Sequence, residues 1–349
     1  MVLEVIYVVR HGYRSNWVVD ASTGTYSSSY PTPTGIPSDP ALAVYGVKQS
    51  QELASHLLAL NPPIDKIYSS PFYRCIQTLS PFTDKLVEQK GEQNVQVVLE
   101  PGLGEFYGLA RFDHPRPATV EVLNRHFGYL AVEPEPVIVP STKGESIPQL
   151  HDRVAYCLHQ IIRQADSDPK GPRALVICTH AASMICIGRA LTGRMPEDEG
   201  EEDFRCFTCA FSKYVRKSTG RQDEVQAWDP QVPDSVPDVG WRGTGVAGGW
   251  ECAVNGDCSF LSGGEERGWD FTIHAEAEAK YTAERAALAA KHHTDDIGAM
   301  QIDAEAAAMA AERVATAAQL SQRSEEPRLD LTKGLEQFLA RDGEEVDGA

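Results

Sequence analysis

The sequence predicts an α/β protein in which a mainly parallel sheet carries helices on both faces, followed by an aromatic-rich C-terminal arm and an acidic helical tail. The first observation is a set of short apolar runs at residues 2–9, 64–69 and 174–178 (VLEVIYVV, IDKIYS and ALVIC). Such β-branched runs are typical of strands buried on both faces of a sheet. The second is that segments with helical spacing lie between them, and strands that alternate with helices form parallel sheets.

The remaining elements follow in order along the chain. After the first strand, the Ser-, Thr- and Pro-rich stretch 20–39 predicts a long surface loop. Apolar residues then recur at helical spacing over 43–60, and Asn61-Pro62-Pro63 ends that helix because proline cannot continue it. Further helices are predicted to start near Tyr73 and to cover 147–165 and 182–191, and a further strand is predicted over 204–216.

Charge divides the chain into regions. The 349 residues include 32 basic and 50 acidic side chains, a formal net charge of -18, which argues against direct binding of nucleic acid. Residues 221–349 hold 26 of the acidic and only 11 of the basic side chains. We therefore predict a catalytic domain over 1–220, an arm rich in Gly, Pro and aromatic residues over 221–274, and a partly disordered, Ala-rich acidic helical tail over 275–349.

The sequence also indicates the cellular compartment in which the protein resides. No run approaches the roughly 18 apolar residues of a membrane-spanning helix, and the apolar run at 2–9 lacks the basic leader and cleavage site of a signal peptide. The eight cysteines lie mostly in apolar segments, which fits a reducing compartment better than a disulfide framework. We expect a cytoplasmic or nuclear protein that does not contact a membrane.

Cationic side chains follow three of the predicted strands. Arg10, His11 and Arg14 come after the first strand, Arg74 after the second, and His180 after the strand at 174–178. Because ligands of such sheets bind beyond the carboxyl ends of the strands, these groups should converge there. A lone His-Gly or Ser-Pro pair is usually only a turn, but the combination predicts a compact cationic pocket whose natural ligand is a phosphate.

The segments that carry these residues resemble the histidine phosphatase superfamily, which has the phosphoglycerate-mutase-like fold. The likeness covers about residues 1–216, and its landmark segments occur in the family's order: VIYVVRHGYR, DPALAVYGVKQSQELA, IYSSPFYRCIQT, PGLGEFYG, KGESIPQLHDRV and ALVICTHAAS. It implies hydrolysis of a phosphomonoester without metal or cofactor, because arginines supply the charge that a metal supplies elsewhere. The implied substrate is a phosphorylated small molecule or a phosphoprotein.

The resemblance also implies a role for each site residue. His11 would attack phosphorus and form a phosphohistidine, which water then hydrolyses. Glu105 would protonate the leaving oxygen and later act as the base for water, with Glu100 and Asp113 as its competitors. The residues expected to hold the phosphate oxygens are Arg10, Arg14, Arg74 and His180.

Two positions depart from the family pattern. Tyr13 follows Gly12, where the related mutases and fructose bisphosphatases carry a Glu, so a mutase or sugar-bisphosphate activity is disfavoured. Ala181 follows His180, where the family usually has Gly, and its methyl group would make the pocket tighter or the activity weaker. The loop at 20–39 and the segment 106–140 are expected to roof the pocket. The sequence does not give the placement of their side chains, so it does not identify the substrate.

The cysteines and glycines outside this pattern are weaker signals. Cys206 and Cys209 form a CxxC that Cys252 and Cys258 could complete as a zinc site, but the apolar strand pattern around the first pair favours structural cysteines. The glycine-rich stretches 245–249 and 262–268 do not follow a strand and open a helix, as a phosphate loop does. His292 and His293 could bind a metal, but a solvated helix is the commoner setting.

The arm carries an aromatic cluster that a disordered linker would not need. We favour an arm that packs on the phosphatase domain, with docking of another protein through residues 221–349 as the alternative. The stretch NGDCSFLSGGEERGWDF is similar to a segment that follows the phosphatase domain in fungal proteins, including the tau subunit of the RNA polymerase III factor TFIIIC. A transcription-factor subunit that uses the fold as a scaffold is thus the rival function. The cluster consists of Trp241, Trp250, Phe260, Trp269 and Phe271.

Overall fold

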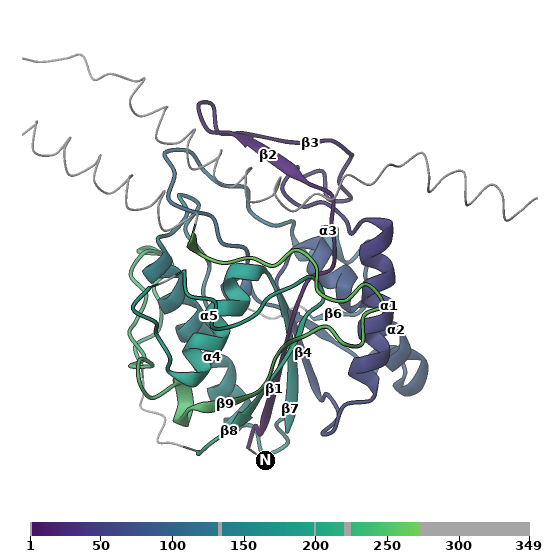
Figure 1. Cartoon of the computed structure of the whole chain (residues 1–349), viewed down its shortest axis with the longest axis vertical. Coiled ribbons are helices and arrows are strands. Elements are labelled where there is room, and N and C mark those ends of the chain that lie inside the picture. The colour runs from purple at the N-terminus through teal and green to yellow at the C-terminus, as the bar shows by residue number, and fades with distance from the viewer. Residues whose placement is uncertain (1, 132–134, 199, 220–224, 273–349) are drawn as a thin grey trace, which may run out of the picture.

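A seven-stranded sheet forms the centre of the molecule in the computed structural model, which describes residues 2–131, 135–198, 200–219 and 225–272 (Figure 1). The strand order is β6-β5-β4-β7-β1-β8-β9, and the pairs from β6 to β1 are all parallel. The predicted mainly parallel α/β fold is therefore confirmed. The strands are β1 (Val5–Arg10), β4 (Lys66–Ser69), β5 (Val97–Leu99), β6 (Leu130–Ala131), β7 (Ala174–Thr179), β8 (Phe211–Arg216) and β9 (Trp250–Asp257).

Helices cover both faces of this sheet. Figure 1 shows α1 (Val44–Leu58) and α2 (Tyr73–Lys90) on one side, and α4 (Ile147–Ser167) and α5 (Ala181–Thr192) on the other. Ser146 starts α4 with a capping box, in which its hydroxyl accepts from the Gln149 N–H and the Gln149 side chain accepts from the Ser146 N–H. The short helical segments are η1 (Glu92–Asn94), η2 (Pro101–Leu103), α3 (Val120–Leu123) and η3 (Val246–Gly248).

The two central strands set the position of the site. All residues of β1 and β7 are buried, as their unbroken apolar runs predict. The strands pair in parallel with Val5 opposite Ala174 and Arg10 opposite Thr179. This register puts the residues that follow the two strands, His11 and His180, side by side at the carboxyl edge of the sheet.

Three elements differ from the sequence expectation. The stretch 20–39 is not all loop, because β2 (Trp17–Asp20) and β3 (Thr25–Ser28) form an antiparallel hairpin that begins before it and ends within it. The strand expected over 204–216 begins only at Phe211, since residues 204–210 form an irregular connection. The sheet also continues beyond residue 220, because β9 of the arm pairs antiparallel with β8.

The aromatic cluster of the arm lies against the rest of the molecule. Trp241, Trp250 and Phe271 are almost fully buried, whereas Phe260 and Trp269 are partly buried. The described part of the arm therefore packs in cis, which was the favoured expectation. The tail predicted over 275–349, with His292 and His293, lies outside the described residues.

The cysteines of the proposed zinc site have other contacts. Cys206 Sγ donates to the carbonyl of Trp269 at 3.1 Å, and Cys252 Sγ donates to the carbonyl of Val254 at 3.4 Å. Across the described ranges, the two cysteine pairs do not form a group of metal ligands. Within the same ranges, none of the helices combines the length and the apolar character that crossing a membrane requires.

Candidate active site

His11 follows β1 directly and lies at the centre of the site. Its backbone N–H donates to the carbonyl of Thr179 at 2.9 Å, and its Nδ1 lies 2.8 Å from the carbonyl oxygen of Gly12. A carbonyl oxygen can only accept, so Nδ1 carries the proton and Nε2 of the neutral ring keeps its lone pair. Burial, together with the positive charges of Arg74 and His180, holds the pKa of His11 well below its ordinary value. The ring is therefore neutral at pH 7.

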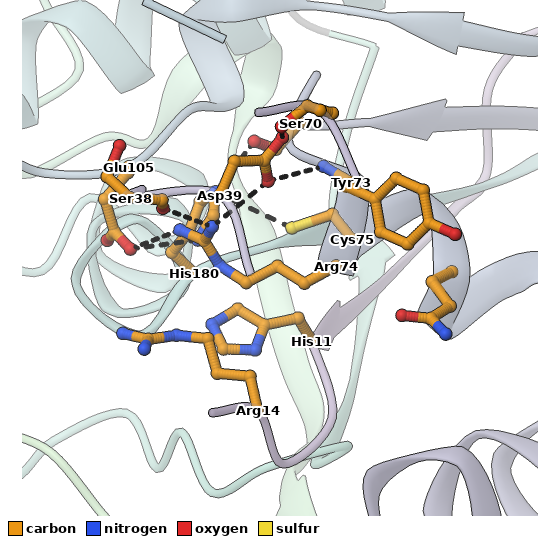
Figure 2. A network of polar contacts seen from close by, with 12 residues as sticks. His11, Arg14, Ser38, Asp39, Ser70, Tyr73, Arg74, Cys75, Glu105 and His180 are labelled. Atoms are coloured by element: carbon orange, nitrogen blue, oxygen red, sulfur yellow. Dashed lines mark hydrogen bonds and ion pairs between the residues drawn. The ribbon is translucent and has the colours of Figure 1, made fainter. Parts of the chain in front are cut away.

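Arg74, the second residue of α2, is fully buried and faces His11. Figure 2 shows the imidazole of His11 between the side chains of Arg74 and Arg14. The Nη2 of Arg74 donates to Glu105 Oε2 at 2.8 Å, and Nη1 donates to the carbonyl of Ser38 at 3.1 Å. Figure 2 also shows Asp39, whose Oδ1 lies 3.5 Å from Nη1. Carboxylates on both sides thus fix the plane of this guanidinium.

His180 is the N-cap residue of α5 and touches the same groups. Its Nε2 lies 2.7 Å from the hydroxyl of Ser70, and its Nδ1 lies 3.2 Å from Glu105 Oε2. Burial lowers the pKa of His180, but Cys75 and Glu105 outweigh burial and raise that pKa above its ordinary value. The ring of His180 packs edge-on against His11, with the centroids 5.3 Å apart. His180 can therefore present an N–H to an anion that lies over His11.

Arg14 and Arg10 complete the cationic group. Burial and the charge of Arg74 lower the pKa of Arg14, which shows how closely the positive charges are packed. Arg10 is held differently, because its Nη1 donates to two backbone carbonyls, those of Cys206 at 2.6 Å and of Arg267. Arg10 is one of the four residues predicted to hold phosphate, and its Nη1 already has two backbone partners.

Glu105 lies on the turn that follows η2. Burial would raise its pKa, but His180 and Arg74 outweigh burial and hold the pKa of Glu105 well below its ordinary value. Three donors fix this turn by binding the carbonyl oxygens of successive residues. They are Arg153 Nη1 to Gly102 at 2.7 Å, Thr179 Oγ1 to Leu103 at 2.6 Å, and Ser183 Oγ to Gly104 at 2.7 Å.

The two competitors of Glu105 have other environments. Glu100 is buried and accepts from the backbone N–H groups of Gly102, Val137 and Ile138, and burial raises its pKa to about 7. Asp113 is exposed and pairs with Thr142 and Lys143. Neither carboxyl group contacts the two histidines, so the geometry favours Glu105.

The site suits an anion better than a metal ion. Nitrogen atoms of His11 and His180 and a carboxylate oxygen of Glu105 lie within 4.8 Å of one another, a spacing that a metal could use. The charges of Arg74 and Arg14 act on the same space, as their effect on the pKa of His11 shows, and they repel a cation. A phosphate dianion would instead compensate these charges.

A cavity of about 180 Å³ adjoins Glu105. Its walls are largely apolar and rich in proline, and two side chains of the wall belong to an aromatic roof. In this roof, Tyr26 of β3 contacts His114 Nδ1 at 2.5 Å, and the His114 ring stacks on Tyr107 at 4.7 Å. The lining residues are Pro71, Phe72, Pro101, Gly104, Glu105, Tyr107, His114, Pro115, Arg116, Pro117, Val139, Pro140, Ser141 and Thr142.

The two departures from the family pattern have structural explanations. The Tyr13 N–H donates to Gln49 Oε1 at 2.9 Å, and the Tyr13 ring packs between Tyr45 and the guanidinium of Arg267. An aromatic ring therefore replaces the acidic group of the related enzymes beside the site. Ala181 is the first residue of α5 and is buried with its small side chain in the core.

Sequence reasoning did not find Ser70, Asp39 or Arg267. Ser70 belongs to the Ser-Pro turn after β4, a position that signals a turn more strongly than a ligand. Asp39 ends the stretch 20–39, where one acidic residue among polar neighbours gives no signal. Arg267 lies more than 250 residues from Arg10, and its carbonyl makes the contact.

The fold and these residues are those of a histidine phosphatase. Residues 6–228 match the family model of the histidine phosphatase superfamily (branch 1). The chain belongs to this superfamily, as its motifs indicate. It is also 35% identical, over 286 residues, to the transcription factor tau 55 kDa subunit of Saccharomyces cerevisiae, a match that covers 79% of this chain and 60% of the yeast protein. The predicted likeness to a tau subunit is thus confirmed.

One further relative and one solved structure carry phosphatase names. The chain is 27% identical over 223 residues to the ecdysteroid-phosphate phosphatase of Drosophila melanogaster, which covers 56% of this chain and 28% of the fly protein. A crystal structure of the ecdysone phosphate phosphatase of Bombyx mori with tungstate matches with a TM-score of 0.46 and 16% identity, covering 66% of this chain and 99% of that chain. The chain therefore spans 60% of the length of its yeast relative and less than a third of that of its fly relative.

Proposed function

We propose that this chain is a metal-independent phosphomonoesterase that works through a phosphohistidine on His11. The observation that carries the proposal is the bond from His11 Nδ1 to the Gly12 carbonyl, which leaves the Nε2 lone pair free amid cationic groups. Nε2 attacks phosphorus, the bond from phosphorus to the ester oxygen breaks, and Arg74, Arg14 and His180 stabilise the charge of the transferred group. Water then attacks the phosphohistidine, phosphate leaves, and Nε2 regains its lone pair.

Glu105 handles the proton in both steps. It protonates the leaving oxygen in the first step, and its carboxylate takes a proton from water in the second. In the ligand-free site, His180 and Arg74 keep Glu105 ionised. A bound phosphate dianion draws on these same positive charges, so substrate binding raises the pKa of Glu105 and allows it to carry the proton that the first step needs.

The cavity beside Glu105 suggests the leaving group. Because Glu105 lines it, an alcohol that occupies the cavity would place its ester oxygen within reach of the proton donor. Prolines and aromatic rings give the walls a rigid apolar surface, with Arg116 as the one side chain of the lining that carries a fixed positive charge. This mostly apolar environment favours phosphate esters of rigid apolar alcohols, such as aryl phosphates, over sugar phosphates, whose several hydroxyls would find few partners.

Hydrolysis of an aryl phosphate by the purified chain in the presence of a chelator tests the proposal. His11→Ala should abolish turnover and leave the fold intact, whereas His126→Ala, which removes an exposed histidine outside the site, should retain it. Acid-labile, alkali-stable labelling of the wild type by phosphate should likewise disappear in His11→Ala. Turnover above a few per cent in His11→Ala, or no turnover in the wild type, would contradict the proposal.

The similarity to the yeast tau 55 kDa subunit supports a second function. The match covers 79% of this chain, and we propose that the chain is also a subunit of a nuclear transcription factor of this kind, with residues 221–349 as its partner-binding region. The excess of acidic side chains in these residues suits a basic partner surface. Affinity purification of the full chain from its own cells, followed by mass spectrometry, should recover transcription-factor subunits. Recovery of a monomer with undiminished phosphatase activity would contradict this second proposal.

A further inference from the structure

A segment of the C-terminal arm packs against the residues that follow β1, next to the active site. This segment, residues 265–269, is called the strap below. The carbonyl of Glu266 accepts from the Thr208 N–H at 3.0 Å, and the carbonyl of Trp269 accepts from Cys206 Sγ at 3.1 Å. These bonds fix the strap at two points along the connection that precedes β8. The family match ends at residue 228, so the strap lies outside it.

Arg267, between these two points, makes three contacts with the segment that carries the nucleophile. Its carbonyl accepts from Nη1 of Arg10. Its guanidinium lies 3.7 Å from the centre of the Tyr13 ring, within the range of a strong cation–π contact. Its Nη1 donates to Asn16 Oδ1 at 3.4 Å. One residue of the strap thus holds residues 10, 13 and 16, which flank His11 and Arg14.

The backbone of Arg267 gives a second, independent sign that its side chain matters. Its φ of 51° lies in the left-handed region, which is unfavourable for an L-residue with a side chain and which glycine adopts freely. Glycines stand nearby at positions 263, 264 and 268, yet position 267 carries an arginine. A large side chain in such a conformation is often kept for a function.

The charge of Arg267 also acts on the site, because it is one of the groups that lower the pKa of Arg14. The arginine therefore adds to the positive charge around Arg14, which the Glu105 carboxylate offsets only in part, because the pKa of Arg14 is lowered overall. A residue that served only to attach the arm would not need to place a positive charge close to Arg14.

We propose that Arg267 is a positioning residue of the phosphatase, through which the C-terminal arm holds Arg10 and Arg14 in place around a phosphoryl group. The inference rests on the proposed function and extends it, since it makes the arm part of the active site. Without the Arg267 side chain, the segment from Tyr13 to Asn16 loses the cation–π contact on Tyr13 and the hydrogen bond from Arg267 to Asn16. Arg14 then samples positions away from the phosphate, and displacements of about 1 Å in such groups cost up to about 100-fold in rate.

Arg267→Gly is the test variant, because glycine keeps the backbone carbonyl and adopts the left-handed conformation without strain. The matched control is Arg242→Ala. Arg242 also belongs to the arm, its guanidinium lies 4.6 Å from the centre of the Trp241 ring, and it pairs with Asp152 at 2.8 Å, remote from the site. Both variants remove one arm arginine that is stacked on an aromatic ring, so they differ in location rather than in type.

Two measurements on the full chain decide the matter. In aryl phosphate hydrolysis, Arg267→Gly should lower kcat/KM about 10- to 100-fold, while its thermal midpoint stays near that of the wild type. In calorimetric titration with inorganic phosphate, the same variant should bind about tenfold more weakly. Arg242→Ala should match the wild type in both. The inference is overturned if Arg267→Gly stays within twofold of the wild type in phosphate binding, or if both variants lose affinity alike.

The phosphate titration separates this inference from the proposed function. A wild type that binds phosphate but hydrolyses no aryl phosphate would refute the phosphatase proposal. The comparison of phosphate binding between Arg267→Gly and Arg242→Ala would still show whether Arg267 organises the site.

Discussion

Arg74 and Glu105 form an ion pair at the centre of the site, with Nη2 and Oε2 2.8 Å apart and the arginine fully buried. The pair joins the cation that would bind a phosphoryl oxygen to the carboxylate that would move the proton. A ligand dianion and Glu105 thus compete for the same guanidinium, so phosphate binding and proton affinity at Glu105 are coupled.

Glu105→Gln should separate the two chemical steps. Glutamine can accept from Arg74 but cannot transfer a proton, so kcat for an alkyl phosphate should fall about 100- to 10,000-fold. A nitrophenyl ester, whose leaving group needs no proton, should still release its alcohol in a burst of up to one equivalent, seen by stopped-flow absorbance. Asp113→Asn should behave as the wild type. Equal losses on both esters, with no burst, would exclude Glu105 as the proton donor.

Buried histidines should make the fold sensitive to acid. Burial lowers the pKa of both His114 and His151 to about 4. As the pH falls below about 6.5, where histidine in the unfolded chain takes up a proton, each of these buried rings stays neutral. The free energy of unfolding should therefore decrease by up to about 1.4 kcal/mol per pH unit for each ring between pH 6.5 and pH 4. Urea unfolding at pH 5, 6 and 7 measures this slope.

His151→Gln provides the control for this pH effect. The variant keeps a polar side chain in place of His151 but has nothing to titrate, so its slope below pH 6.5 should be shallower by one ring's share. A slope equal to that of the wild type would mean that His151 is protonated in the folded protein.

Arg153 should be essential for stability and for the position of Glu105. It is buried with Glu145, which it contacts through two nitrogens, and it also donates to the Gly102 carbonyl. Arg153→Met leaves the Glu145 carboxylate buried without its partner and should cost about 3 to 5 kcal/mol in urea unfolding. Arg153→Met with Glu145→Leu should recover much of the stability but not the activity, since the bond to Gly102 stays lost.

Gly46 should tolerate no side chain. A Cβ atom at this position in α1 would lie 1.9 Å from the carbonyl oxygen of Tyr13, which accepts from the Ala43 N–H at 2.9 Å. Gly46→Ala should therefore cost about 1 to 3 kcal/mol and reduce kcat/KM, because α1 and the segment after Gly12 must separate. Gly128→Ala is the control, since its Cβ would meet only the flexible end of Glu92 at 3.2 Å. Similar losses in both variants would contradict the expected role of this close approach.

The parts of the fold that the sequence predicts are those with strong local patterns. The strands β1, β4 and β7 are apolar runs, and the predicted bounds of these strands and of α1, α4 and α5 lie within a few residues of the observed ones; for α2 only the start was predicted, and it lies at Tyr73 as expected. The strands β5 and β6 have three and two residues, too few for any period to show. In β9, buried and exposed positions do not alternate regularly and Gly256 interrupts the run, so its pairing with β8 decides its conformation.

The same distinction holds for the site. His11, His180 and Arg74 were predictable because strand ends of a parallel sheet meet at one edge. Ser70 and Asp39 orient these groups through contacts that depend on where separate loops meet. Arg267 lies near the end of the described residues and makes its contacts with its carbonyl oxygen, to Arg10, and with its guanidinium, on the face of the Tyr13 ring. Local sequence patterns do not predict contacts of either kind.

The place of β9 in the sheet has a consequence for the limits of the folding unit. The family match ends at residue 228, but β8 has its outer partner only in Trp250–Asp257. A chain shortened to residue 228 would leave the N–H and C=O groups along that side of β8 without their sheet partners, and unpaired edges of this kind pair with other chains. The part of the chain that matches the family model should therefore aggregate on its own, and we expect a stable fragment to extend to Phe271, whose ring is buried in the core.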